Sequence, residues 1–208
     1  LRTFQALEGK GYDVTYVPVE ADGRVTADAV AQALRDDTVL ISVMYANNEI
    51  GTVEPVRQIA ETAHRHGVLF HTDAVQAYGQ IPISVQEDNI DLLSASGHKF
   101  YGPKGIGFLY IRKGLKLRSF IHGGAQERKR RAGTENITGI VGIAKAVEIA
   151  FATMDERIKH ETEVRDYAIK RILAEVPYCR LNGSLANRLP GNCNISFQFI
   201  EGNELLLL

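Results

Sequence analysis

Three short apolar runs, each followed at once by polar residues, constrain the fold of this chain more than any other feature. The runs cover residues 38–44, 68–72 and 91–95. Helical patterns accompany the first two runs. One begins at Thr26, which can cap a helix, and one begins at Pro55, which suits a first helical turn. This alternation is typical of an α/β fold in which helices cover a mainly parallel sheet. The run at 38–44 is almost continuously apolar, which predicts a strand buried on both faces.

The remainder of the chain predicts further elements and a second region. We expect helices at residues 1–10, 137–154 and 155–176, and strands at residues 13–19, 108–111, 178–182 and 193–199. The pattern becomes α+β near residue 150, which predicts a large domain at residues 1–150 and the start of a small domain at residues 151–208. Leu1 begins as if inside a helix and the chain stops in an apolar run at 205–208. We therefore expect an internal piece of a longer protein, with both domains truncated.

Composition excludes several classes of protein. The chain has 208 residues and a net charge of −1, which does not favour binding to nucleic acid. No stretch is long and apolar enough to span a bilayer. The two cysteines, Cys179 and Cys193, have no metal-binding spacing and are expected to be core thiols, so no metal site is predicted. Two unpaired thiols favour a reducing compartment, and we expect a cytoplasmic protein, with an organellar location left open.

Lys99 follows the third apolar run, in a turn that also contains Ser96, Gly97 and His98. Ligands of open α/β sheets bind at the carboxyl ends of the strands, where this turn is expected to lie. An amine can form an imine with a carbonyl compound. Hydroxyl, imidazole and backbone N–H groups can hold a phosphate, and Gly97 between Ser96 and His98 suggests a small concave nest for one. The alternative is a solvated lysine in a loop whose neighbours satisfy local backbone groups.

Asp73 follows the second run directly, and Asn48 lies just beyond the first. Asp73 can cap the next turn, or it can keep a pyridine ring protonated, since a carboxylate and a cation stabilise each other's charge. Gln76 can donate to a ring oxygen or be an exposed turn residue. Asn48 can orient a ring oxygen or substrate, or serve as an ordinary turn residue. The basic run at 128–131 is interpreted as a solvated or interface loop.

Four motifs in order along the chain resemble the cysteine desulfurases, which are NifS-like enzymes in the class V aminotransferase group. They are NNEIG at 47–51, HTDAVQ at 71–76, SASGHK with YGPKG at 94–105, and RAGTEN at 131–136. The resemblance extends over almost the whole chain. It implies a fold-type I enzyme that uses pyridoxal 5'-phosphate and works as a homodimer with its sites near the subunit interface.

The resemblance also assigns roles to single residues. Lys99 is similar to the catalytic lysine that binds the cofactor covalently, and Asp73 to the partner of the pyridinium nitrogen. Gln76 is similar to the residue that bonds the ring's phenolic oxygen, and Asn48 to another cofactor-site residue. The remaining assignments are phosphate ligands: Ser96, His98 and, lent by the other subunit, Thr134.

By this resemblance the full-length protein would remove sulfur from L-cysteine, leaving L-alanine and an enzyme persulfide. The sulfur would go to an acceptor or iron–sulfur scaffold protein. The nucleophilic cysteine and the substrate-binding arginine would follow Leu208, while a phosphate-binding turn and a ring-stacking histidine would precede Leu1. The chain alone is therefore expected to be inactive. A selenocysteine lyase, another class V aminotransferase and a non-enzymatic relative remain as alternatives.

Overall fold

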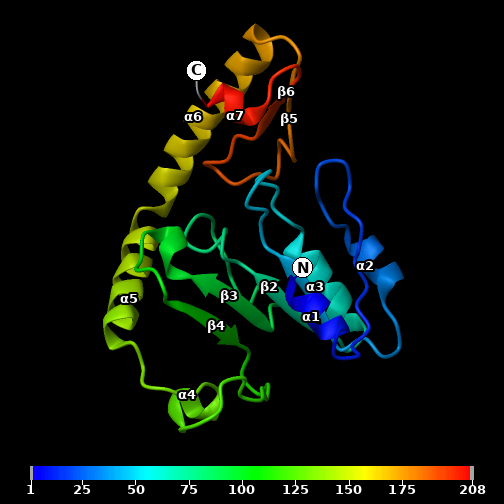
Figure 1. Cartoon of the computed structure of the whole chain (residues 1–208), viewed down its shortest axis with the longest axis vertical. Helices are drawn as coiled ribbons and strands as arrows, with labels where there is room; N and C mark the ends of the chain where they lie inside the picture. The colour runs from blue at the N-terminus through cyan, green and yellow to red at the C-terminus, as the bar shows by residue number, and fades with distance from the viewer. Residues whose placement is uncertain (1, 207–208) are drawn as a thin grey trace.

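The computed structural model describes residues 2–206 and shows a sheet with helices packed around it (Figure 1). Leu1, Leu207 and Leu208, part of the chain ends discussed above, lie outside the described residues. The helices are α1 (Arg2–Glu8), α2 (Ala27–Ala33), α3 (Val56–Arg65), α4 (Gln126–Lys129), α5 (Ile137–Ala152), α6 (Met154–Glu175), α7 (Gly202–Leu205) and the 3₁₀ helix η1 (Gly97–Phe100). The strands are β1 (Leu40–Met44), β2 (Leu69–Asp73), β3 (Leu92–Ser96), β4 (Gly107–Ile111), β5 (Cys179–Leu181) and β6 (Ile195–Phe197).

The main sheet has the order β1-β2-β3-β4. β1, β2 and β3 are parallel, as predicted, and β4 returns antiparallel beside β3. The return is short because η1 reverses the chain directly after β3, which leaves no room for a crossover helix. The α/β fold class, with a mainly parallel sheet, is confirmed.

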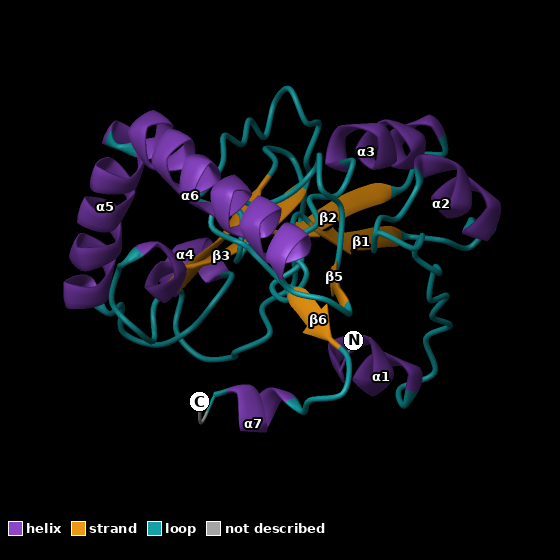
Figure 2. Cartoon of the chain, turned by 90° about the horizontal axis from the view of Figure 1, so that it is seen from above, coloured by secondary structure: helices purple, strands orange, loops and turns teal. Residues whose placement is uncertain are grey.

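Two helices cover one side of this sheet, and Figure 2 shows α2 and α3 together there. The Thr26 hydroxyl caps α2 by accepting the Ala29 N–H at 3.1 Å. Helix α3 follows Pro55 and turns Ile59, Ala60 and Ala63 into the core, where each is fully buried. These residues share an apolar cluster with the strands, so the predicted inward face of α3 is confirmed.

Two predictions about strands are wrong. Residues 13–19 form no strand, because they make no ladder with any neighbouring segment in the described part of the chain. Tyr16 and Val19 are 44% and 59% exposed, so the β-like pattern there is not buried in a sheet. Strand β1 is not buried on both faces: it lies at the edge of the described sheet, and Leu40 is 39% exposed.

The predicted long helices are confirmed as α5 and α6, which meet at Thr153. Helix α5 packs against η1, and α6 packs against β5 of the antiparallel β5–β6 pair. The domain division at residue 150 stays a prediction. Within residues 2–206, no single helix is long and apolar enough to cross a membrane; only α5 and α6 taken together reach that length and composition, with a 66° bend between them.

Candidate active site

The parallel strands bring three predicted site segments to one edge of the sheet. Met44 at the end of β1 pairs in register with Asp73 at the end of β2, and Asp73 pairs with Ser94 of β3. The segments that contain Asn48, Asp73 and Lys99 follow these positions, so they leave the sheet at the same edge. The expected convergence of the polar segments is confirmed at the level of the backbone.

The lysine turn, residues 96–101, is held firmly by its own chain. Phe100 is 1% exposed and packs with Ile143, Ala146 and Ala150 of α5. The Gln80 side-chain amide donates to the Lys99 carbonyl oxygen at 3.0 Å. These contacts use the backbone and Phe100, so they leave the Lys99 amine free. The Lys99 side chain is half-buried and makes no ion pair or hydrogen bond among the described residues.

Ser96 and His98 lie together in this turn, with Ser96 Oγ 2.8 Å from His98 Nδ1. The expected backbone nest is wrong in one respect, since the Gly97 N–H donates to the Ile106 carbonyl oxygen at 2.9 Å. A phosphate here would therefore be bound by the side chains of Ser96 and His98, with no bond from the Gly97 amide. Gly97 also packs closely against α5, because a Cβ there would lie 3.1 Å from Ile143 Cδ1.

Asp73 ends β2 with an exposed side chain. One carboxylate oxygen, Oδ1, accepts the Val75 N–H at 3.0 Å, which is the turn-capping role considered above. The other oxygen has no hydrogen-bond partner among the described residues and is open to a cationic ligand. Gln76 is half-buried in the turn that follows. The structural and the cofactor-binding roles of Asp73 are thus compatible.

Asn48 is exposed near the tip of the loop after β1. The turn-forming role belongs to its neighbour: Asn47 Oδ1 accepts the N–H groups of Glu49 and Ile50 at 2.8 and 3.0 Å. The Asn48 side chain makes no hydrogen bond within residues 2–206. It is therefore free to bind a ligand.

Thr134 lies in a different segment, which makes no hydrogen bond to the other site segments among the described residues. It is exposed in the α4 loop, residues 119–136, which extends away from the sheet at the bottom of Figure 1. The backbone contacts of this loop are internal, such as the hydrogen bond from the Ala132 N–H to the Ile121 carbonyl oxygen. Glu127, Arg128 and Lys129 have positive φ angles of 48°, 56° and 65°. Such left-handed residues cost energy and persist where surrounding structure holds them.

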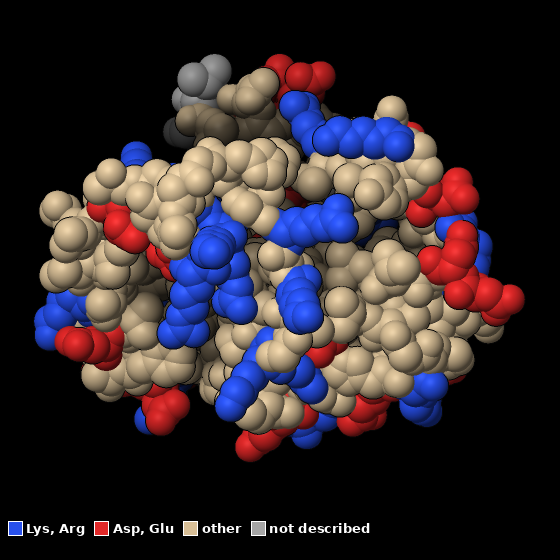
Figure 3. Space-filling model, turned by 90° about the horizontal axis from the view of Figure 1, so that it is seen from below, with Lys and Arg blue, Asp and Glu red and all other residues tan. Residues whose placement is uncertain are grey.

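Lys and Arg side chains gather on the face where α4 lies (Figure 3). The four residues of the run at 128–131, interpreted as a solvated or interface loop, are all exposed. Its four residues form no salt bridge with other described residues. The loop thus presents its charge to solvent or to a partner.

Sequence reasoning missed a polar row inside the sheet. His71 of β2 lies between two serines of the neighbouring strands, with Nδ1 2.8 Å from Ser42 Oγ and Nε2 2.9 Å from Ser94 Oγ. Burial lowers the pKa of His71, and the nearby Asp73 carboxylate partly opposes this. Burial therefore favours the neutral imidazole two residues from Asp73, where an imidazolium would compete for the carboxylate. Single polar residues inside otherwise apolar strands were the signal in the sequence.

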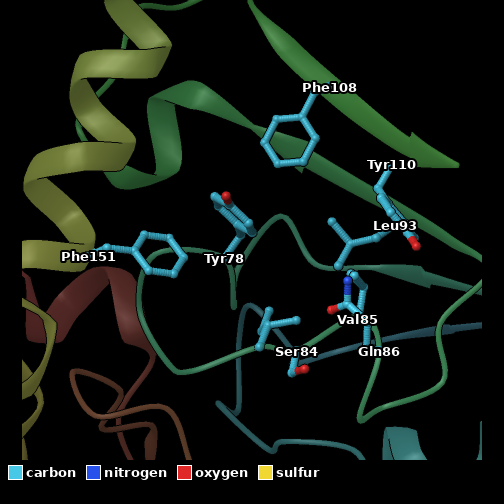
Figure 4. A pocket seen from close by; sticks show the side chains of 9 residues that line it. Tyr78, Ser84, Val85, Gln86, Leu93, Phe108, Tyr110 and Phe151 are labelled. Atoms are coloured by element: carbon cyan, nitrogen blue, oxygen red, sulfur yellow. The ribbon is translucent and has the colours of Figure 1, made fainter. Parts of the chain in front are cut away.

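An apolar cavity of about 400 Å³ lies beside the lysine turn but is not the predicted site. Figure 4 shows Tyr78 between Phe108 and Phe151, and the ring centroids are 5.0 and 5.6 Å from that of Tyr78. None of the predicted site residues lines the cavity. The described residues also contain no cluster of His, Cys, Asp or Glu suited to a metal ion.

Both free cysteines differ from the expected core thiols. Cys193 is exposed, and Cys179 is half-buried with its thiol donating to the Val176 carbonyl oxygen at 3.1 Å. The prediction that Cys193 is buried is therefore wrong, because Cys193 lies in the loop before β6 and not in the strand.

Comparison with protein families gives a match to the aminotransferase class-V model over residues 2–208. A curated relative described as cysteine desulfurase IscS from Methanosarcina thermophila is 54% identical over the whole chain and is itself 51% covered. A second, also described as cysteine desulfurase IscS, from Dictyoglomus turgidum, is 52% identical over 97% of this chain and 51% of the relative. The chain thus spans about half the length of the curated relatives it matches.

Solved structures agree with these matches. A structure described as a NifS-like protein superimposes with a TM-score of 0.94 at 40% identity, covering all of this chain and 57% of the other. DndA from Streptomyces lividans superimposes with a TM-score of 0.90 at 30% identity, covering 99% of this chain and 59% of the other.

Proposed function

This chain belongs to the aminotransferase class-V family, and we propose that the full-length protein is a cysteine desulfurase. In the proposed reaction the C–S bond of L-cysteine breaks, the sulfur passes to an enzyme thiol, and the substrate carbon takes up a proton to give L-alanine. The products are then L-alanine and an enzyme persulfide. The single observation that supports this most is the 54% identity to a relative described as a cysteine desulfurase.

The residues at the sheet edge fit pyridoxal 5'-phosphate in their chemistry. Among the described residues, one carboxylate oxygen of Asp73 has no hydrogen-bond partner and the Lys99 amine has no ion pair. Ser96 and His98 offer a hydroxyl and an imidazole side by side. These groups complement a cationic ring nitrogen, an aldehyde and a phosphate. When bound, the cofactor supplies an electron sink that stabilises negative charge at the substrate Cα.

In this proposal Lys99 would hold the cofactor through its amine, and Lys99 Nζ would move the proton at the substrate Cα. Asp73 keeps the proton on the ring nitrogen, since its negative charge favours the cationic form. Gln76 donates to the ring's phenolic oxygen, and Asn48 orients the ring or the substrate. His71 assists by staying neutral, which leaves the Asp73 carboxylate free for the ring.

Ser96 and His98 hold the phosphate from one subunit, and Thr134 holds it from the other. A homodimer is supported by the α4 loop, which extends away from the sheet, and by the exposed apolar side chains of α5. Ile137, Val141 and Ile149 are 69%, 64% and 54% exposed, and α5 begins three residues after Thr134. A second copy covering this helix would bury apolar surface and bring its own Thr134 to the first subunit's site.

We assign the nucleophilic thiol to neither Cys179 nor Cys193, and we propose that an acceptor or iron–sulfur scaffold protein receives the sulfur. The test uses the full-length protein with pyridoxal 5'-phosphate and L-cysteine, without a keto acid. Alanine and protein-bound persulfide are followed together. Equal yields support the desulfurase, and mapping of the persulfide peptide identifies the thiol.

Other outcomes of this test point to the alternatives. Alanine that forms only after a keto acid is added indicates a class V aminotransferase. Faster turnover of L-selenocysteine, with little from L-cysteine, indicates a selenocysteine lyase. A protein that develops no visible absorbance with pyridoxal 5'-phosphate is a non-enzymatic relative.

A further inference from the structure

The loop that contains Asn48 is hydrogen-bonded to residues 189–194, which lie far along the chain. The side-chain amides of Asn192 and Asn194 both donate to the Glu49 carbonyl oxygen, at 2.9 and 3.1 Å. The Leu189 N–H donates to the Gly51 carbonyl oxygen at 2.9 Å. The partners are up to 145 positions apart in sequence, so this contact joins the β5–β6 region to the edge of the main sheet.

The orientation of both asparagine amides is determined by what their oxygens accept. Arg188 donates to Asn192 Oδ1 at 2.6 Å, and Asn182 donates to Asn194 Oδ1 at 2.8 Å. Because the oxygens are occupied in this way, the NH₂ groups are the ones that reach Glu49. Each amide is thus fixed as a donor toward the loop.

Arg188 is an unusual residue to find at this position. It is 6% exposed, and it bonds the Ser184 and Asn182 carbonyl oxygens as well as Asn192. None of the salt bridges among the described residues involves it. Burying a charge destabilises the folded state unless the charge is well hydrogen-bonded. This guanidinium donates only to neutral oxygens of the segment that contacts the loop.

Two glycines allow the segments to approach this closely. A Cβ at Gly51, where φ is +74°, would lie 2.3 Å from Asn192 Cγ. A Cβ at Gly183, where φ is +80°, would lie 2.4 Å from the Ile50 carbonyl oxygen. Each glycine combines a left-handed backbone with a contact that no larger residue permits, so the two segments are shaped to fit one another.

We propose that Arg188, Asn192 and Asn194, here called the C-terminal clamp, are positioning residues that hold Asn48 at the cofactor edge. Asn192 and Asn194 donate to the carbonyl oxygen of Glu49, the residue after Asn48. In the same loop, Asn47 Oδ1 accepts the Glu49 N–H. The inference rests on the proposed function, because it takes Asn48 as a cofactor-site residue. It extends that function by assigning a role in cofactor binding to the β5–β6 region.

The experiment compares three variants of the full-length protein. Asn192→Asp keeps the shape and a partner for Arg188 but removes the donor to Glu49. Asn192→Ala/Asn194→Ala removes both donors. Asn187→Ala is the matched control, because Asn187 is an exposed asparagine of the same segment whose side chain makes no hydrogen bond among the described residues.

Two readouts are measured for each variant. Hydrogen exchange of residues 47–51 is followed without cofactor, and pyridoxal 5'-phosphate affinity is followed by visible absorbance. Both clamp variants are expected to exchange faster in the loop and to bind the cofactor about fivefold more weakly, as expected for the loss of one or two hydrogen bonds. Asn192→Asp is expected to do so with an unchanged urea midpoint, and Asn187→Ala to match the wild type.

The outcomes separate the clamp from the proposed function. Faster exchange with unchanged cofactor affinity would show a merely structural contact and overturn the inference. Unchanged exchange in both variants would overturn it as well. If the wild-type protein binds no pyridoxal 5'-phosphate, the proposed function fails and the positioning role fails with it, while the exchange data still show whether the contact restrains the loop.

Discussion

The lysine turn and the α4 loop both contain predicted phosphate ligands, yet they are held in opposite ways. The lysine turn is anchored by Phe100, which is 1% exposed, and by the bond from Gln80 to the Lys99 carbonyl oxygen. The α4 loop exposes Phe120 by 89% and contains three consecutive left-handed residues. The lysine turn is packed by its own chain, whereas the α4 loop has the exposure expected of a segment that packs against a partner.

This difference shows how a site can be divided between subunits. Residues that perform chemistry on the substrate need rigid support, which the sheet edge and α5 supply. A residue lent to another copy must instead leave the body of its own chain. A loop that presents such a residue is expected to be exposed and strained until the second copy binds, and the α4 loop has both features.

The largest expected effect comes from Lys99→Ala in the lysine turn. Removing the amine eliminates covalent cofactor attachment and the group that moves the Cα proton. Alanine formation from L-cysteine by the full-length protein should fall at least about 10³-fold, in the range of lost acid–base and covalent catalysis. Lys104→Ala, at an exposed lysine of the same region, is the control and should keep its activity. Full activity of Lys99→Ala would end the proposed mechanism.

The two phenylalanines test the difference in support directly. Phe100→Ala leaves a cavity beneath the lysine turn and should lower the free energy of unfolding by about 3–5 kcal/mol. Phe120→Ala in the α4 loop should change it by less than about 0.5 kcal/mol in the isolated subunit, since the ring contacts little there. Urea unfolding of the full-length protein, at concentrations that keep it monomeric, measures both. Equal losses would mean that the α4 loop is as firmly packed as the turn.

Mixing two variants tests whether Thr134 acts across the interface, at a cofactor concentration low enough to leave Thr134→Ala largely without cofactor. Thr134→Ala should weaken cofactor affinity by about tenfold, as for a lost bond to a charged phosphate. When it is co-expressed with Lys99→Ala, each mixed dimer contains one site with both residues intact, so activity should return well above that of either variant. If Thr134 acted within its own chain, every mixed site would lack one residue and activity would stay low.

The smallest expected effect is on the pH dependence of stability. Because burial lowers the pKa of His71, the folded state binds a proton there less readily than the unfolded state. Well above the unfolded pKa of about 6.5, neither state binds the proton and His71 costs no stability. As the pH falls below that value, the unfolded state takes up the proton first, so the free energy of unfolding decreases. His71→Gln should flatten the fall in urea midpoint between pH 7.5 and 5. His122→Gln, in the exposed α4 loop, is the control. An unchanged slope in His71→Gln would contradict this role.

Much of the candidate site could be predicted from local sequence. The polar residues that follow three apolar runs marked Asn48, Asp73 and the lysine turn, since parallel strands align their carboxyl ends. Whether these residues bind a cofactor stays a prediction. The geometry adds that Asp73 and the lysine turn retain free functional groups after their structural bonds are made.

Other features could not be read from local pattern. The Ser42–His71–Ser94 row requires the register of three strands, and the C-terminal clamp joins residues more than 140 positions apart. The Gly97 amide is occupied by the Ile106 carbonyl oxygen, which depends on how β4 returns. Each of these depends on which distant groups meet, and no local periodicity encodes that.

The sequence by itself determined α2, α3, α5 and α6, the parallel strands and the order of the site segments, because side-chain periodicity, caps and turn residues act over a few neighbours. Tertiary structure alone decided that residues 13–19 form no strand, that β1 lies at the edge of the described sheet and that the Asn48 loop is held from the β5–β6 region. A strand or a loop is stabilised only when its polar groups find partners, and those partners come from elsewhere in the chain.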